Sequence, residues 1–264
     1  MTTRHKTPPT GPRHRPRLDP DTRGGLRLTL AAAGTLILLL PFSLLLLLVA
    51  DHWQPLRQLD HDLAAQLNND AFGHPSYVTV LKATWNTVGH PAVFQVIAVA
   101  VAFWLGIRRR PRLAAWLVVT VFGGGLLSST VKAAVGRKRP LLAHPVAHAA
   151  SASFPSGHAI GSVVGVGALL LVFLPSARRA TRPLLLTLGA LWVLAIGFSR
   201  LGLGVHYLTD VLGGYLLGAG WLAVTTALFT AWRRDLARPA RPLIQGLEPS
   251  GPEPHADHRS GPGP

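Results

Sequence analysis

Residues 157–174 read GHAIGSVVGVGALLLVFL, an apolar stretch that contains no Lys, Arg, Asp or Glu. A helix needs about 20 such residues to cross the hydrocarbon core of a bilayer. Gly157, Gly161 and Gly165 recur every four residues, so they would share one face of that helix. Small residues on one face let helices approach closely in lipid, where packing holds them together. The stretch therefore predicts a membrane-spanning helix with close neighbours.

Five further stretches have the length and composition of membrane spans, or nearly so. They cover residues 28–50, 90–107, 113–131, 184–199 and 211–231. The stretch 184–199 is short unless it continues toward Leu203, and 211–231 carries Gly214 and Gly218 at the same four-residue spacing. A composition with 48% hydrophobic and 14% charged residues, and a mean hydropathy of +0.32, fits this class. We predict an all-α, polytopic membrane protein with six transmembrane helices in a bundle, with 157–174 and 211–231 at its centre.

The basic residues of the connecting segments indicate the orientation, because segments rich in Lys and Arg stay on the cytoplasmic side during insertion. Residues 1–27 hold seven, 108–112 four, 178–182 three and the segment from Arg233 onward five, whereas the segments on the other side hold only seven in all. Both termini are therefore predicted to be cytoplasmic. The formal net charge of +15 would also suit a nucleic-acid-binding protein. However, the charge lies between apolar stretches and not on a soluble face, so we predict no nucleic-acid partner.

The chain divides into three parts. Residues 1–27 and 232–264 are rich in Pro, Arg and Gly and poor in apolar side chains, so we predict two disordered cytoplasmic tails. Residues 28–231 form the six-helix membrane domain. Within it, residues 51–89 are too polar to span the bilayer, and the apolar spacing around Leu59, Leu63 and Leu67 predicts a helix that lies on the external membrane surface. The absence of cysteine excludes disulfides, thiolate metal sites and a cysteine nucleophile.

Three polar segments fall at the predicted external ends of the helices. In the first, Lys132 and Arg139 are seven residues apart, which places both on one face if the helix continues to Pro140. Taken alone, a solvated basic helix end beside Arg137 and Lys138 explains this segment at least as well. Positive charge on the external side nevertheless runs against the insertion bias, and an anionic ligand is the simplest reason for it.

The second polar segment opens the stretch 157–174 with Pro155, Ser156, Gly157 and His158. Ser156 can cap the helix, and the free backbone N–H groups of the first turn then form an anion-binding site. Gly157 allows phosphate oxygens to approach the backbone, and His158 can donate a proton to a leaving oxygen. A plain helix cap with an incidental histidine is the alternative interpretation.

The third polar segment contains Arg200, His206 and Asp210, separated by six and four residues. The last two would share a helix face, and a carboxylate bonded to one imidazole nitrogen leaves the other nitrogen as a nucleophile or base. A metal site is the rival interpretation, but no third and fourth ligands occur at matching spacing. We interpret His144 and His148, in a nearby loop, as bystanders.

Taken together, the three segments resemble the three-part signature of the type 2 phosphatidic acid phosphatase superfamily. The matching elements are Lys132, six residues, Arg139-Pro140; Pro155-Ser156-Gly157-His158; and Ser199-Arg200, five residues, His206, three residues, Asp210. The resemblance implies an all-helical phosphatase that needs no metal or other cofactor and forms a covalent phosphohistidine. It also implies that His206 is the nucleophile, Asp210 its orienting partner and His158 the acid. The phosphoryl oxygens would be held by Lys132, Arg139, Arg200, Ser156 and the backbone of Gly157.

The leading hypothesis is hydrolysis of a lipid phosphate or diphosphate at the outer leaflet of a bacterial plasma membrane. Undecaprenyl diphosphate, phosphatidylglycerol phosphate and phosphatidic acid all present suitable headgroups. Phosphotransfer to another membrane acceptor is an alternative, because an alcohol can intercept a phosphohistidine. A non-catalytic carrier of anionic lipids would explain the cations but leave His206 and Asp210 without a role. The soluble haloperoxidases of the same superfamily do not fit six spans.

Overall fold

The computed structural model describes residues 20–235, and all of its regular elements in that range are helical. They are α1 (Pro20–Ala50), α2 (Gln54–Phe72), α3 (Pro75–Val80), the π-helix η1 (Leu81–Asn86), α4 (Pro91–Ile107), α5 (Pro111–Val135), α6 (Gly157–Phe173), the short 3₁₀ turns η2 (Leu174–Ser176) and η3 (Arg179–Thr181), α7 (Arg182–Gly202) and α8 (Leu208–Asp235). The all-α prediction is confirmed.

Each of the six apolar stretches forms a helix. Four helical segments within the described residues are long and apolar enough to cross a membrane: Pro111–Val135, Gly157–Ser176, Arg179–Gly202 and Leu208–Trp232. A fifth is possible if Leu36–Ala50 and the bent continuation Gln54–Phe72 form one span, and α4 is apolar but somewhat shorter. The protein is thus an integral membrane protein with four to five candidate spans by length and composition.

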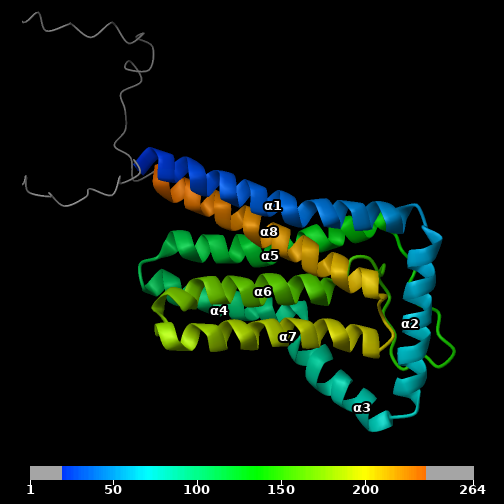
Figure 1. The fold of residues 1–264 in the computed structure, drawn as a ribbon. Helices are drawn as coiled ribbons and strands as arrows, with labels where there is room; N and C mark the ends of the chain where they lie inside the picture. The colour runs from blue at the N-terminus through cyan, green and yellow to red at the C-terminus, as the bar shows by residue number, and fades with distance from the viewer. Residues whose placement is uncertain (1–19, 236–264) are drawn as a thin grey trace, which may run out of the picture.

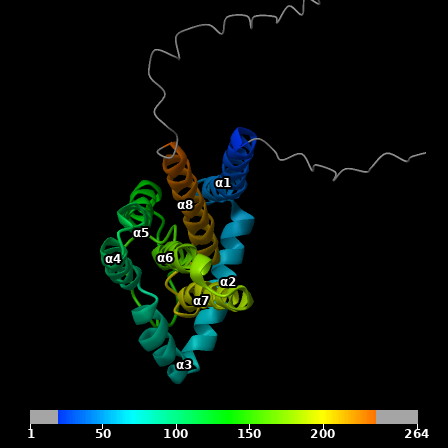
Figure 2. The ribbon, with the colours of Figure 1, turned by 90° about the vertical axis from the view of Figure 1, so that its left-hand side faces the viewer.

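Helix α6 lies at the centre of the bundle (Figure 2). It contacts α4, α5, α7 and α8, whereas α1 packs chiefly against α8 at the outside. The glycines allow this: an added Cβ at Gly165 would lie 2.4 Å from the ring of Phe94 in α4. One at Gly214 of α8 would lie 2.7 Å from the Cβ of Ala159 in α6. The central placement of α6 and α8 is confirmed, and it rests on these close approaches.

Helix α2 runs across one end of the bundle (Figure 1). Its axis is turned by 88° from that of the preceding part of α1. The face buried against the protein consists of Asp60, Ala64, Asn68 and Ala71, whereas Leu59 is 53% exposed. The helix predicted around Leu59 therefore exists. Pro20 at the start of α1 and Asp235 at the end of α8 lie at the opposite end of the bundle from α2 (Figure 1).

Several helix boundaries differ from those expected. Residues 20–27, assigned to the N-terminal tail, belong to helix α1, and α8 continues to Asp235. Helix α5 does not reach Pro140, because Gly136 adopts the left-handed conformation (φ 60°) that commonly ends a helix. The predicted disorder of the tails concerns residues 1–19 and 236–264, which lie outside the described residues.

Candidate active site

The three polar segments meet at the end of the bundle that α2 crosses. A cavity of about 350 Å³ lies there, and its walls are formed by Lys82, Arg139, Val146, Ala147, His148, Ala149, His158, Arg200, Leu203, Val205 and His206. One residue or more from each of the three segments faces this space. The predicted convergence of the motifs is therefore observed.

His206 lies in the turn between α7 and α8, two residues before Leu208, so the expectation that His206 and Asp210 share a helix face is wrong. Its Nδ1 is 3.3 Å from Oδ2 of Asp210, which is in the first turn of α8. The same oxygen accepts a hydrogen bond from the backbone N–H of Tyr207 at 2.9 Å. The carboxylate of Asp210 thus caps the helix and also orients the imidazole of His206. The other ring nitrogen, Nε2, points toward Arg139, whose Nη1 is 3.3 Å away.

The electrostatic environment of His206 favours its neutral form. Its side chain is 4% exposed, and this burial lowers its pKa from 6.5 to about 4. The hydrogen bond and charge of Asp210 act in the opposite direction, while the charges of Arg139 and Lys132 add to the lowering. A neutral imidazole whose Nδ1 donates to a carboxylate has a lone pair on Nε2. Such a nitrogen can act as a nucleophile or as a base.

The cations at the cavity are held by neutral acceptors. Lys132 Nζ donates to the carbonyl of Ala152 at 2.6 Å, and Arg139 donates to the carbonyls of Ser151 at 2.7 Å and Val205 at 2.5 Å. Within residues 20–235 neither side chain forms an ion pair with a carboxylate. Their positive charge is therefore positioned but not neutralised, as an anion-binding site requires.

Arg200 is 2% exposed and lies beside the second histidine. Its Nε and Nη2 donate to the hydroxyl of Ser199 at 3.1 and 3.0 Å, and its Nη1 is 3.4 Å from Nε2 of His158. The ring of His158 also meets that of His90 edge to face, with 5.3 Å between centroids. His158 is therefore adjacent to the guanidinium of Arg200.

Ser156 caps helix α6 as predicted. Its hydroxyl accepts from the backbone N–H of Ala159 at 3.4 Å, and its own N–H donates to the carbonyl of Asp210 at 2.9 Å. An added Cβ on Gly157 would meet Ser128 Oγ at 3.5 Å and Lys132 Cε at 3.8 Å. The N-terminus of α6 thus faces Lys132, and the bond to Asp210 couples it to the start of α8.

Arg137, which sequence reasoning set aside as part of a solvated helix end, is part of the site. Its guanidinium donates from Nη1 to Asp210 Oδ1 at 2.7 Å and from Nη2 to Asp60 Oδ2 at 2.8 Å. It also stacks on the ring of Tyr207, 4.3 Å from the centroid. Burial acts to lower the pKa of Arg137, but the attraction of Asp210 and Asp60 outweighs it, so the pKa is raised.

Asp60 was also missed by sequence reasoning. It is fully buried on α2 and accepts from the backbone N–H of Thr209 at 3.1 Å and from its hydroxyl at 2.5 Å. Asp60, Arg137 and Asp210 therefore form a continuous network from α2 to the imidazole of His206. The sequence feature that could have indicated this role is the four-residue spacing of Asp60, Ala64 and Asn68, which places polar and small side chains on one face of the helix.

The two loop histidines have different positions. His144 stacks on Phe72 with 4.1 Å between centroids, and its backbone exchanges two hydrogen bonds with the side chain of Asn68, so it anchors the loop on α2. His148 contributes to the wall of the cavity together with Lys82, which sequence reasoning had not assigned to the site. Among the described residues, no group of three or more His, Cys, Asp or Glu side chains is arranged to hold a metal ion.

Comparison with known proteins places these residues in a family. The model of the PAP2 superfamily matches residues 113–234, which contain all three polar segments. The chain is 42% identical to phosphatidylglycerophosphatase B of Bacillus subtilis over 106 residues, covering 39% of this chain and 51% of that protein. It is 35% identical to lipid A 1-phosphatase of Rhizobium etli over 128 residues, covering 45% of this chain and 51% of that protein. The chain thus spans about half the length of these two relatives.

A third relative is matched over most of its length. Undecaprenyl-diphosphatase BcrC of Bacillus subtilis is 30% identical over 171 residues, covering 63% of this chain and 81% of that protein. The crystal structure of a transmembrane PAP2 type phosphatidylglycerolphosphate phosphatase from Bacillus subtilis has the same fold, with a TM-score of 0.61 at 24% identity over 78% of this chain and 99% of that one. The match to the PAP2 model and the similarity to undecaprenyl-diphosphatase BcrC show that the chain belongs to the PAP2 superfamily.

Proposed function

We propose that this protein hydrolyses a lipid phosphate or lipid diphosphate, without a metal ion, through a phosphohistidine on His206. The observation that carries the proposal is the oriented His206–Asp210 pair at a cavity whose wall also holds His158, Arg139 and Arg200. Relatives named as phosphatidylglycerophosphatase, lipid A 1-phosphatase and undecaprenyl-diphosphatase support a lipid-phosphate substrate. Nothing in these names selects one lipid for this chain.

In the first step, Nε2 of His206 attacks the phosphorus atom and the bond from phosphorus to the leaving oxygen breaks. His158 donates a proton to that oxygen. The lipid alcohol, or the lipid monophosphate from a diphosphate, therefore departs with its leaving oxygen protonated. Asp210 stabilises the positive charge that develops on the imidazole. In the second step, His158 takes a proton from water, the resulting hydroxide attacks phosphorus, and the N–P bond breaks to release inorganic phosphate.

The positive charge that this chemistry requires comes from the protein itself. Phosphoryl transfer spreads negative charge over three equatorial oxygens. Lys132, Arg139 and Arg200 would hold these oxygens together with the N-terminus of α6 at Ser156 and Gly157. Because Lys132 and Arg139 are fixed by carbonyl groups, they need little rearrangement when the phosphate enters. We therefore expect full activity in the presence of a chelator.

The phosphate-release experiment tests the proposal. Purified full-length protein, assayed in EDTA with a panel of lipid monophosphates and diphosphates, should release inorganic phosphate, and His206→Ala should abolish the release. His74→Ala is a matched control, because His74 is an exposed histidine at the same end of the molecule, and its ring contacts the carbonyl of Asp70 and lies outside the cavity lining. Turnover that persists in His206→Ala, or that requires a divalent metal, would contradict the mechanism.

We further propose six membrane spans, with α1 and α4 added to the spans formed by α5, α6, α7 and α8, both termini in the cytoplasm and the active site on the external face of a bacterial plasma membrane. The distribution of basic residues supports this orientation, and α2 would lie at the external surface with Leu59 toward lipid. No nucleic-acid partner is expected.

The absence of cysteine makes the topology simple to test. Single cysteines replacing exposed Asn69 in α2 and exposed Ala65 one turn earlier should react with a membrane-impermeant maleimide in intact cells. A cysteine replacing exposed Arg109, between α4 and α5, should react only after permeabilisation. Labelling of Arg109→Cys in intact cells would overturn the proposed orientation.

The walls of the cavity favour a diphosphate as one of the substrates. Lys82 and His148 line the same space as Arg139 and Arg200 but are not part of the three motifs. They add positive charge and hydrogen-bond donors beyond those needed for one phosphoryl group. A second phosphate bonded to the first would lie within reach of this part of the wall.

Phosphotransfer remains the second enzymatic candidate, because the same phosphohistidine can be attacked by an alcohol in place of water. Product analysis with a lipid diphosphate and a candidate acceptor distinguishes the two: free phosphate indicates hydrolysis, and a phosphorylated acceptor indicates transfer. Tight lipid binding without any turnover across the panel would instead indicate a carrier.

A further inference from the structure

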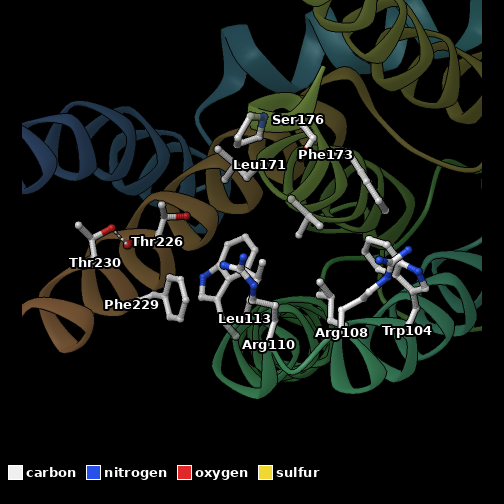
Figure 3. Close-up of a pocket in the computed structure, with 14 residues that line it drawn as sticks. Trp104, Arg108, Arg110, Leu113, Leu171, Phe173, Ser176, Thr226, Phe229 and Thr230 are labelled. Atoms are coloured by element: carbon white, nitrogen blue, oxygen red, sulfur yellow. Dashed lines mark hydrogen bonds between the residues drawn. The ribbon is translucent and has the colours of Figure 1, made fainter. Parts of the chain in front are cut away.

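A second cavity (Figure 3) lies at the end of the bundle opposite to the one that α2 crosses (Figure 1). Its volume is about 700 Å³, compared with about 350 Å³ for the catalytic cavity. Its walls come from the C-terminal parts of α4, α6 and α8 and the N-terminal part of α5, with residues of the α4–α5 connection. The proposed mechanism uses none of these residues.

Four aromatic side chains line this cavity and form two pairs. Trp104 of α4 faces Phe173 at the end of α6, with 5.9 Å between ring centroids, and Trp116 of α5 faces Phe229 of α8 at 5.7 Å. In Figure 3 the side chains of Trp104 and Phe173 lie on one side of the space and Phe229 lies on the other. Two aromatic pairs that flank an open volume provide a surface for a hydrocarbon chain.

Among the residues that the structure describes, the charged groups that line this cavity are all positive: they are Arg108 and Arg110, without any Asp or Glu. The guanidinium of Arg108 lies over the ring of Trp104, 5.4 Å from the centroid. Within the described range, neither arginine forms an ion pair. An aromatic-walled cavity whose polar edge is cationic is complementary to a molecule with an apolar chain and an anionic head.

The indole of Trp116 provides an independent indication of a ligand. The residue is 7% exposed, and its Nε1 has no hydrogen-bond partner within the part of the chain that the structure describes. Buried N–H groups are nearly always bonded, and an indole N–H can only donate. An acceptor at the wall of the cavity, such as a phosphate or ester oxygen, would satisfy this N–H group.

We propose that this cavity binds one anionic phospholipid. Its phosphate would lie between Arg108 and Arg110, an oxygen of the head or the ester region would accept from Trp116, and an acyl chain would lie between the two aromatic pairs. In the proposed topology this end lies in the cytoplasmic leaflet, whose anionic lipids attract basic segments. A lipid bound here is a bundle length away from His206, so it is a resident lipid and not a substrate in position for hydrolysis.

Native mass spectrometry of the full-length protein tests the proposal by measuring the binding of dioleoylphosphatidylglycerol and dioleoylphosphatidylcholine. The double variant Arg108→Ala/Arg110→Ala should bind the first lipid about tenfold more weakly, because charge-assisted hydrogen bonds to its phosphate are lost. The control is Arg178→Ala/Arg179→Ala, which removes two exposed arginines at the same end that do not line the cavity. It should retain the affinity of the unmodified chain.

A second variant separates the cavity from general surface charge. Trp116→Phe keeps an aromatic ring but removes the indole N–H, so it should weaken phosphatidylglycerol binding by roughly threefold. Phosphate release by each variant checks that the fold is retained. Equal weakening in both double variants, or none in either, would overturn the proposal. So would loss of the bound lipid in Arg200→Ala alone, because the lipid would then belong to the catalytic cavity.

Discussion

The two ends of the helical bundle hold their cations in different ways. At the α2 end, Lys132 and Arg139 donate short hydrogen bonds to carbonyls, and Arg137 joins two buried carboxylates. At the other end, Arg108 lies on the ring face of Trp104 in an exposed position. The first arrangement holds positive charge in place, as the proposed phosphoryl transfer requires, whereas the second suits the headgroup of the proposed lipid. The proposed chemistry therefore depends on the α2 end.

The largest effect should come from Asp210. Replacing it with Asn keeps the shape but removes the charge that holds Nδ1 of His206 as a donor, so we expect kcat to fall by about 10³- to 10⁴-fold. Phosphate release under saturating lipid measures this. The same assay on Thr226→Ala, a helix α8 substitution at the far end, should give a change of less than about twofold. An Asp210→Asn enzyme within tenfold of the unmodified rate would contradict the assigned role.

The second largest effect should come from Asp60, on the helix that crosses the site. Asp60→Asn leaves Arg137 with one carboxylate in place of two, and breaking a buried pair of this kind costs about 3–5 kcal/mol of stability. We also expect kcat to fall by about 10- to 100-fold, because Asp210 loses part of its support. Thermal unfolding and phosphate release are the two measurements.

Asp62→Asn is the matched control for that prediction. It removes the same charge from the same helix, two residues away and exposed to solvent. It should leave stability within about 0.5 kcal/mol and the rate unchanged. If Asp60→Asn and Asp62→Asn behave alike, the network from α2 to His206 has no role in catalysis.

Much of the α2 end was predictable, because its motifs are defined by the spacing of residues along the chain. That spacing relates Lys132, Ser156, His158, Arg200 and His206, and the apolar stretches predict the helices that position them. The contribution of Arg137 was not predictable, because its partner Asp60 is 77 residues away and only the tertiary fold brings them to 2.8 Å. The helix that was expected to align Lys132 with Arg139 ends at Val135, where Gly136 turns the chain.

A smaller effect is expected at the cavity wall. Lys82→Ala should raise KM for a lipid diphosphate by about tenfold and leave KM for the corresponding monophosphate nearly unchanged, because only the second phosphate loses a charged partner. Steady-state kinetics with the two lipids measure the ratio. Equal changes for both would mean that Lys82 does not distinguish them.

The smallest effect on activity is expected from lowering the pH. Burial lowers the pKa of His206 from 6.5 to about 4, so the imidazole is mostly unprotonated, and nucleophilic, at pH values one unit or more above that pKa. After division by the fraction of substrate in its reactive ionisation state, kcat/KM should be flat from pH 7 to about pH 5. A loss of activity centred near pH 6.5 that remains after this correction would show that His206 titrates as an ordinary histidine.

The most direct test of the central claim is a rapid-quench experiment with lipid labelled in the phosphate that is released. The full-length protein, quenched in alkali because phosphohistidine is labile in acid, should carry label on His206 in the first turnover, and His206→Ala should carry none. In His158→Ala the label should both form and disappear more slowly, since His158 protonates the leaving oxygen in the first step and activates the water in the second. Phosphate release from the unmodified protein with no label on His206 at any quench time would contradict the account.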